Sequence, residues 1–144
     1  MKKILNVVIA VATTFSIAQA QQKGKLSVPE KVKHALLEKY PSATKVTWEK
    51  ENGNYEANWG GKSGEDYSVQ FTRDGGFIEI ARAITVSKLP DTIKKYVAAH
   101  YNKLTRITEA TEITDARGEK FYEAEVHGKD IRFNKDGMFV GSEK

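Results

Sequence analysis

Two stretches of this sequence decide the fold: SVPEKVKHALLEKY at residues 27–40 and KLPDTIKKYVAAHY at residues 88–101. Pro29 and Pro90 lie 61 positions apart (90 − 29), and so do Tyr40 and Tyr101 (101 − 40). In both stretches apolar residues recur at every fourth position, which is the pattern of a short amphipathic helix. Self-similarity at a fixed spacing indicates one supersecondary unit that is built twice.

After each helical stretch the apolar residues alternate with polar ones, which predicts half-buried strands. The motif Tyr-Glu-Ala occurs at residues 55–57 and again at 122–124, and a Phe-x-x-Asp-Gly motif occurs at 71–75 and 133–137. We expect an α+β fold, a tandem repeat of one helix plus a four-stranded antiparallel meander, which forms a sheet of about eight strands with two helices on one face. The repeat units are residues 27–83 and 88–141 of a single domain, 21–144. Either one continuous sheet or two docked sheets satisfies the pattern.

The dipeptides Asp74-Gly75 and Asp136-Gly137 favour tight hairpin turns. A two-residue loop at Asp74-Gly75 pairs Phe71 with Ile78 and Val69 with Ile80. The second hairpin then brings Val140 opposite Phe133. In this register Phe77 and Phe139 point away from the helices.

Residues 1–20 have the three parts of a secretory signal peptide: Lys2-Lys3, a mainly apolar run at 4–17, and a small-x-small cleavage site at Ala18-Gln19-Ala20. We therefore expect a periplasmic or secreted protein. No second apolar run of spanning length follows, so no membrane span is expected after cleavage. The sequence contains no cysteine, which excludes a disulfide framework and thiol catalysis.

The charge of the chain offers no sign of nucleic-acid binding. The sequence has 23 basic and 19 acidic residues, and removal of Lys2 and Lys3 leaves 21 against 19. The two signs alternate along the chain, without the basic stripe that nucleic acid requires. We expect no nucleic-acid partner.

The motifs together resemble a known family. They are Val28-Pro29, Tyr40-Pro41-Ser42-Ala43, Val46-Thr47-Trp48, Tyr55-Glu56-Ala57 and Phe71-Thr72-Arg73-Asp74-Gly75. This run is similar to the PepSY-like family of small exported bacterial proteins, also described as β-lactamase-inhibitor-like, in two tandem copies. The resemblance implies a periplasmic, non-enzymatic binding or inhibitory role. The inhibitor that gives the family its description uses the open face of a concave sheet and a protruding loop, and it is disulfide-bonded, unlike this chain.

The sheet face away from the helices is the predicted contact surface for a partner. We expect three aromatic residues on that otherwise polar face, and aromatic residues supply much of the binding energy at interfaces. The segment 60–66 is the only long hairpin loop and has no equivalent in the second unit, so we expect it to contribute as well. The candidate partner-binding residues are Phe77, Phe121, Phe139, Glu79, Glu123, Lys62 and Glu65.

The sequence predicts no catalytic site, cofactor or metal site. His34, His100 and His127 do not coincide in the repeat and have no zinc-like spacing. No nucleophile–base set can be assembled, so we expect no enzyme. The partner is expected to be an exported or envelope protein or peptide of unknown identity, and the protein a monomer or weak dimer. The alternative is a small apolar-ligand carrier or sensor, which would bind between helices and sheet near Leu36, Trp48, Trp59 and Val97.

Overall fold

The computed structural model describes residues 26–101 and 106–142. The predicted signal peptide, residues 1–20, lies outside the described residues. The first unit contains α1 (Glu30–Lys39), β1 (Thr47–Glu51), β2 (Asn54–Trp59), β3 (Tyr67–Phe71) and β4 (Phe77–Ile84). The second follows a short 3₁₀ helix, η1 (Val86–Lys88), and contains α2 (Asp91–His100), β5 (Ile107–Asp115), β6 (Lys120–Val126), β7 (Lys129–Asn134) and β8 (Phe139–Ser142).

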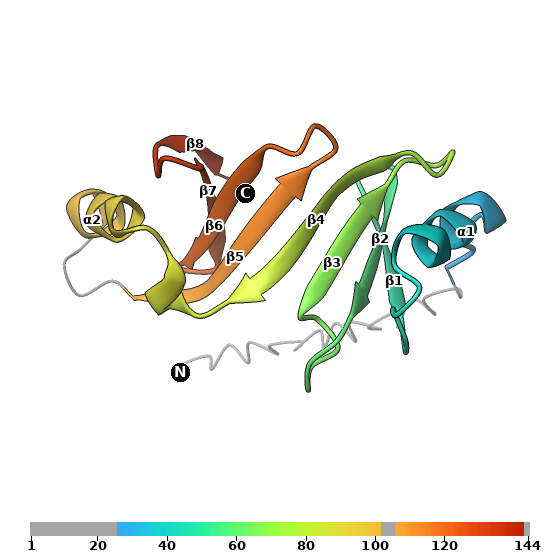
Figure 1. Cartoon of the computed structure of the whole chain (residues 1–144). Helices are drawn as coiled ribbons and strands as arrows, with labels where there is room; N and C mark the ends of the chain where they lie inside the picture. The colour runs from blue at the N-terminus through green and yellow to red at the C-terminus, as the bar shows by residue number, and fades with distance from the viewer. Residues whose placement is uncertain (1–25, 102–105, 143–144) are drawn as a thin grey trace, which may run out of the picture.

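The strands form one continuous eight-stranded antiparallel sheet in the order β1 to β8 (Figure 1). The two units meet where β4 pairs with β5, from Glu79 opposite Asp115 to Ile84 opposite Ala110. The predicted α+β fold is thereby confirmed, and the open question of one sheet or two is answered. The helices lie at opposite ends of the sheet (Figure 1).

Both helices are ten residues long and begin directly after a proline, Pro29 or Pro90. Each buries two residues of its predicted stripe, Val32 and Leu36 in α1 and Ile93 and Val97 in α2. Because a buried side chain of this kind contributes about 1.5–3 kcal/mol, the two stripes are the main attachment of the helices to the sheet.

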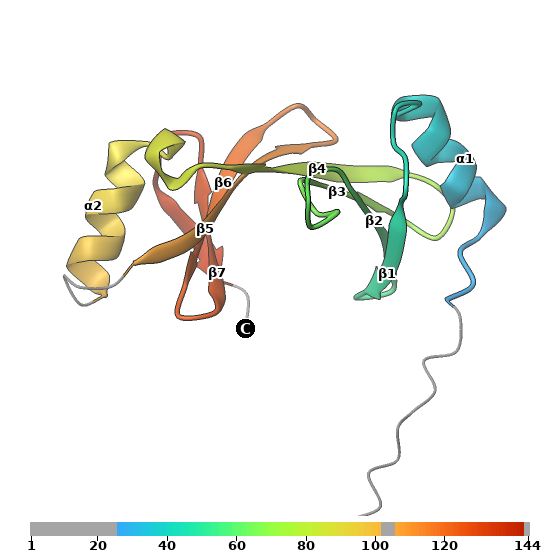
Figure 2. The ribbon, with the colours of Figure 1, turned by 90° about the horizontal axis from the view of Figure 1, so that it is seen from below.

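Each helix covers its own apolar cluster, but both clusters lie on the same face of the sheet. Ile80 packs in the cluster of the first unit and Ile84 in that of the second. These residues are four apart on β4, and side chains an even number of residues apart on a strand point to the same face. One face of the sheet is therefore covered at both ends by helices, and we call the opposite face the concave face. Figure 2 shows the sheet as an arch with the helices on its outer side.

The Asp-Gly turns need glycine because each one touches a helix. Gly75 has φ +86°, and a Cβ added there would lie 2.9 Å from the Lys31 backbone oxygen in α1. Gly137 has φ +79°, and its added Cβ would lie 1.9 Å from Thr92 Oγ1 in α2. Glycine both tolerates a positive φ and leaves room for close approach, so these residues set the distance between hairpin and helix.

The predicted hairpin register is wrong by one residue near the turns. The Gly75 N–H donates to the Thr72 carbonyl at 3.0 Å, and the Thr72 N–H donates to the Gly76 carbonyl at 2.8 Å, so the loop has three residues, 73–75. Phe71 therefore pairs with Phe77, and Ile78 is an extra residue that restores the predicted pair of Val69 and Ile80. An insertion of this kind is a β-bulge.

The second hairpin repeats the same geometry. The Gly137 N–H donates to the Asn134 carbonyl at 2.9 Å, and the Asn134 N–H donates to the Met138 carbonyl at 2.9 Å. Phe133 pairs with Phe139, and the predicted pair of Phe133 and Val140 is wrong. Among the described residues, no helix of the structure is long and apolar enough to span a membrane.

Candidate functional site

The two bulges move Phe77 and Phe139 to the helix side of the sheet. Phe77 packs against the first apolar cluster, with its ring 6.5 Å from that of Tyr40 and 6.1 Å from that of Phe71. Phe139 stacks on Tyr96 of α2, with ring centroids 5.6 Å apart. The prediction that both rings lie on the face away from the helices is wrong, because the register changes by one residue between the turn and the strand.

The concave face contains a groove of about 1030 Å³ that runs across both units. Its lining comes from seven strands, β1 to β7, from the 60–66 loop, and from Thr85 and Val86 at the start of η1. In Figure 2 the concave face is the inner side of the arch, between β1 and β7. Neither α1 nor α2 contributes a residue to the groove.

Acidic side chains dominate the lining of this groove. The carboxylates come from both units and from the loop: Glu49, Glu51, Glu56, Glu65, Asp66, Glu79, Glu109, Glu123 and Asp130. Lys50 is the one basic residue in the same lining. The whole chain carries a formal net charge of +4, so the acidic groove reflects an uneven distribution of charge.

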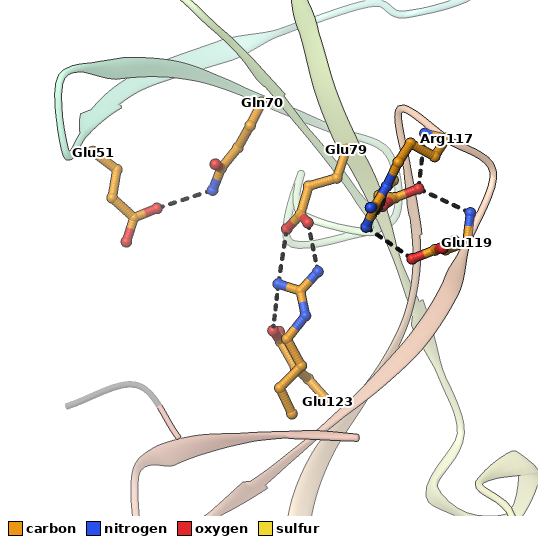
Figure 3. A network of polar contacts seen from close by, with 8 residues as sticks. Glu51, Gln70, Glu79, Arg117, Glu119 and Glu123 are labelled. Atoms are coloured by element: carbon orange, nitrogen blue, oxygen red, sulfur yellow. Dashed lines mark hydrogen bonds and ion pairs between the residues drawn. The ribbon is translucent and has the colours of Figure 1, made fainter. Parts of the chain in front are cut away.

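A guanidinium in the middle of the concave face joins the two units. Arg132 on β7 contacts Glu79 on β4 at 2.6 and 3.3 Å, and Glu123 on β6 at 3.4 Å (Figure 3). The side chains of Glu79 and Glu123 are each 18% exposed, and that of Arg132 is 23% exposed. Because the contact is largely shielded from water and charge-assisted, it restrains the first unit against the second more strongly than a surface ion pair would.

The aromatic ring beneath this guanidinium is Phe121. The Arg132 guanidinium carbon lies 4.8 Å from the centre of the Phe121 ring, which is a cation–π distance. Of the three predicted aromatic residues, Phe121 is thus the one that lies with the concave face. The sequence analysis did not predict that Arg132 bridges two carboxylates from different units.

The predicted loop, residues 60–66, borders the same groove. Ser63, Glu65 and Asp66 line it. The loop is tied to the sheet by the Ala83 N–H, which donates to the Asp66 carbonyl at 2.9 Å. The predicted residue Glu65 therefore lies beside the groove that holds Glu79 and Glu123, while Lys62 is exposed on the loop.

Polar contacts order several of the groove's carboxylates. Ser68 donates a hydrogen bond to Glu56 across the β2–β3 pair, and the Gln70 amide donates to Glu51 at 3.1 Å (Figure 3). Desolvation, together with the Glu125 carboxylate on the neighbouring strand, raises the pKa of Asp130. The hydrogen bonds from Ser68 and Gln70 therefore orient the carboxylates of Glu56 and Glu51 in the groove.

The described residues contain no group of three or more His, Asp and Glu side chains placed to hold a metal ion. His34 lies on α1, His100 on α2, and His127 in the turn between β6 and β7. The concave face thus presents carboxylates, a guanidinium that bridges two of them, and an aromatic ring.

Comparison with known proteins agrees with this architecture. A family model described as "Putative beta-lactamase-inhibitor-like, PepSY-like" matches residues 24–78 and 60–140. The chain belongs to this PepSY-like family, as the sequence resemblance predicted. A search of curated proteins finds no match.

Solved structures share the fold at low sequence identity. A protein from Bacteroides eggerthii described as a putative periplasmic protein has a TM-score of 0.68 at 20% identity and covers 82% of this chain and 89% of its own. A DUF2874 family protein from Bacteroides ovatus has a TM-score of 0.65 at 16% identity, over 83% of this chain and 89% of its own. A BLIP-like protein from Bacteroides fragilis has a TM-score of 0.61 at 18% identity, over 83% of this chain and 88% of its own.

Proposed function

We propose that this protein is an exported, non-enzymatic binding module whose protein partner contacts the concave face and the 60–66 loop. The observation that carries the proposal is the groove of about 1030 Å³ on a sheet face that neither helix covers. Family membership supports a non-catalytic, inhibitor-like role, because the family is described as β-lactamase-inhibitor-like. Export rests on the features of residues 1–20.

The geometry of the groove supports a macromolecular partner. Its lining extends from β1 to β7, so a ligand that filled it would contact both units. The Glu79–Arg132–Glu123 bridge holds the units in a fixed relation, and a pre-organised surface loses less entropy when it binds. A curved, pre-formed sheet face is well suited to receive a convex part of another protein.

The alternative of an apolar-ligand carrier has less support. Leu36, Trp59 and Val97, three of the four residues near which the ligand was expected, are each 7% exposed or less. The fourth, Trp48, is half-buried against the first apolar cluster. Trp59 packs against other rings, with its centroid 5.6 Å from Tyr40 and 5.5 Å from Tyr67. Protein side chains therefore already fill the space that such a ligand would occupy near these residues.

Site-specific photocrosslinking in the native host tests the proposal. A photoreactive amino acid would replace Ser68 or Thr111, which both line the groove. A matched control would carry it at Leu37, which is 57% exposed on α1. We expect the two groove positions, and not Leu37, to give a discrete protein adduct. Adducts at Leu37 alone, or none at the groove positions in well-expressed variants, would contradict the proposed surface.

Export is tested separately. Cell fractionation followed by N-terminal sequencing should recover a chain that begins at Gln21 outside the cytoplasm. An intact Met1 terminus in the cytoplasmic fraction would contradict export. This result is independent of the crosslinking result.

A further inference from the structure

The proposed function does not say what kind of side chains the partner presents, and the charges that line the groove indicate which kind they are. We infer that the partner presents a cationic segment, rich in lysine or arginine side chains, to the concave groove. This inference rests on the proposed function, since it names the kind of partner for the same surface. Three observations carry it: the charge of the groove, the extent over which that charge is spread, and the Arg132 guanidinium that two of the lining carboxylates already bind.

The charge of the groove is unbalanced within the described residues. Nine carboxylates line it against one lysine, and the Arg132 guanidinium beside the lining contacts two of the nine, in a chain whose formal net charge is +4. Glu49, Glu65 and Glu109 are exposed in this lining and make no ion pair with another described residue. Like charges gathered in a concave surface reinforce one another's potential, which attracts a cationic partner and speeds its association.

The extent of the charge favours a chain segment over a compact ion. The carboxylates occur on strands from β1 to β7. Neighbouring strands lie about 4.8 Å apart, so the six intervals from β1 to β7 correspond to about 29 Å measured along the sheet. An extended peptide of about nine residues covers that distance at about 3.3 Å per residue. A single metal ion contacts only ligands about 2–2.6 Å away, and no metal-like group of side chains occurs among the described residues.

Arg132 shows how the concave face receives a guanidinium. It lies over the ring of Phe121 and contacts the carboxylates of Glu79 and Glu123. In the first unit the position across from Glu56 holds the neutral Gln70 instead. Glu49 on β1 and Glu65 in the 60–66 loop make no ion pair with another described residue, and we expect the partner's cationic side chains to concentrate near these two carboxylates.

A charge-neutralising variant tests the inference. Glu49, Glu65 and Glu109 would be changed together to glutamine, a change that removes three charges and no ion pair that the structure shows. The matched control would be Glu38→Gln, Asp74→Asn and Glu119→Gln, which removes three charges outside the groove lining. Thermal unfolding followed by circular dichroism would establish that both triple variants fold.

Two fluorescent nine-residue peptides serve as probes: one with four lysines among glycine and serine, and one with four glutamates in the same positions. Fluorescence anisotropy at 50 and 300 mM NaCl would give the dissociation constants. We expect only the lysine peptide to bind the wild type, with a weaker affinity at 300 than at 50 mM NaCl. The groove variant should bind this peptide about tenfold more weakly than the wild type does, since three exposed ion pairs contribute about 0.5 kcal/mol each. The control variant should bind within about twofold of the wild type. Equal weakening by both triple variants, or no preference for lysine, would overturn the inference.

The two proposals can fail separately. If the groove photocrosslinks capture a partner whose contacting segment is neutral or acidic, the function stands and the cationic inference is wrong. If the lysine peptide binds as expected but no groove position forms an adduct in the native host, the groove recognises cations and the proposed function is wrong.

Discussion

The two units place different residues at one equivalent cross-strand position. In the first unit, Glu56 lies opposite Gln70, whose amide reaches Glu51 within the same unit. In the second, Glu123 lies opposite Arg132, whose guanidinium reaches across to Glu79 of the first unit. The backbone geometry is the same, but one pair acts within its unit and the other joins the units. The two units thus share a backbone arrangement and differ in the side chains that they place on the concave face.

The two units also differ in the aromatic contacts on the sheet face that the helices cover. In the first unit Lys39 lies over the ring of Phe77, with 4.4 Å between its Nζ atom and the ring centre. In the second unit Phe139 stacks on Tyr96, which stacks in turn on His100 with centroids 3.9 Å apart. Phe139 is 47% exposed and flanked by exposed Met138 and Val140, because β8 is the edge of the sheet. An equivalent position therefore does not imply an equivalent environment.

The largest effect should come from the equivalent core residues Phe71 and Phe133, which are 1% and 0% exposed. Phe71→Ala and Phe133→Ala should each lower the free energy of unfolding by about 3–5 kcal/mol, because each leaves a cavity in its cluster. Since the units share the β4–β5 ladder, each variant should still unfold in one transition. Urea unfolding followed by circular dichroism measures both the free energy of unfolding and the number of transitions. Two separate transitions would show that the units are independent.

The Asp-Gly turns provide a second comparison. Gly75→Ala should cost about 2–3 kcal/mol, since the new Cβ meets the backbone of α1, and Gly137→Ala about 1 kcal/mol less, since it meets the movable side chain of Thr92. Thr92→Ala should recover part of the Gly137→Ala loss and none of the Gly75→Ala loss. Thermal unfolding of the single and double variants gives the comparison. Equal rescue of both glycine variants would contradict the contacts described here.

Removal of the Arg132 bridge between the units should lower the free energy of unfolding by a smaller amount. Arg132→Gln makes the second unit resemble the first and leaves Glu79 and Glu123 without the guanidinium that joins them. We expect a loss of about 1–2 kcal/mol, below that of a fully buried pair because the three side chains are partly exposed. Gln70→Ala, at the equivalent position of the first unit, should cost less than 0.5 kcal/mol, or roughly the value of an exposed hydrogen bond. Urea unfolding of both variants tests the difference, and equal losses would contradict the joining role of Arg132.

The smallest effect concerns the turn between β5 and β6. Desolvation raises the pKa of Asp115, but two other influences lower it by more. They are hydrogen bonds from the backbone N–H groups of Glu119 and Arg117, and the guanidinium of Arg117. A lowered pKa in the folded state stabilises the fold above the unfolded-state pKa, near 3.9, and this contribution is lost as the pH falls through the folded-state pKa. Urea unfolding of Asp115→Asn and wild type at pH 7 and pH 2.5 should therefore differ more at pH 7. An equal difference at both pH values would contradict this.

Much of the fold could be predicted from the sequence because it depends on local patterns. The four-residue step from Val28 to Tyr40 and its copy predicted both helices, and strict alternation predicted the strands. The repeat itself predicted a sheet of about eight strands. These signals are periodic and redundant, so no single residue decides them.

The errors came from the turns. Asp74-Gly75 was interpreted as a two-residue loop, but Thr72 and Asn134 are polar residues at the first position of a turn with glycine at the fourth, which favours a three-residue loop followed by a bulge. One residue of difference moves Phe77 and Phe139 to the other face. Phe121 and Glu123 were placed on the correct face because they lie away from the two turn bulges. Glu79 was placed correctly because it follows the bulge residue Ile78, after which the predicted register is restored. The bridge through Arg132 could not be predicted because it joins residues 53 positions apart across two intervening strands, β5 and β6.

The central claim is that the concave face is the contact surface. Nuclear magnetic resonance of the ¹⁵N-labelled protein, titrated with the four-lysine peptide, tests it most directly. We predict that the backbone amide shifts change most at Glu49, Glu65, Ser68 and Thr111, and little at Leu37 and Tyr96. Shift changes concentrated on α1 and α2, with the amides of the concave face unmoved, would contradict the claim.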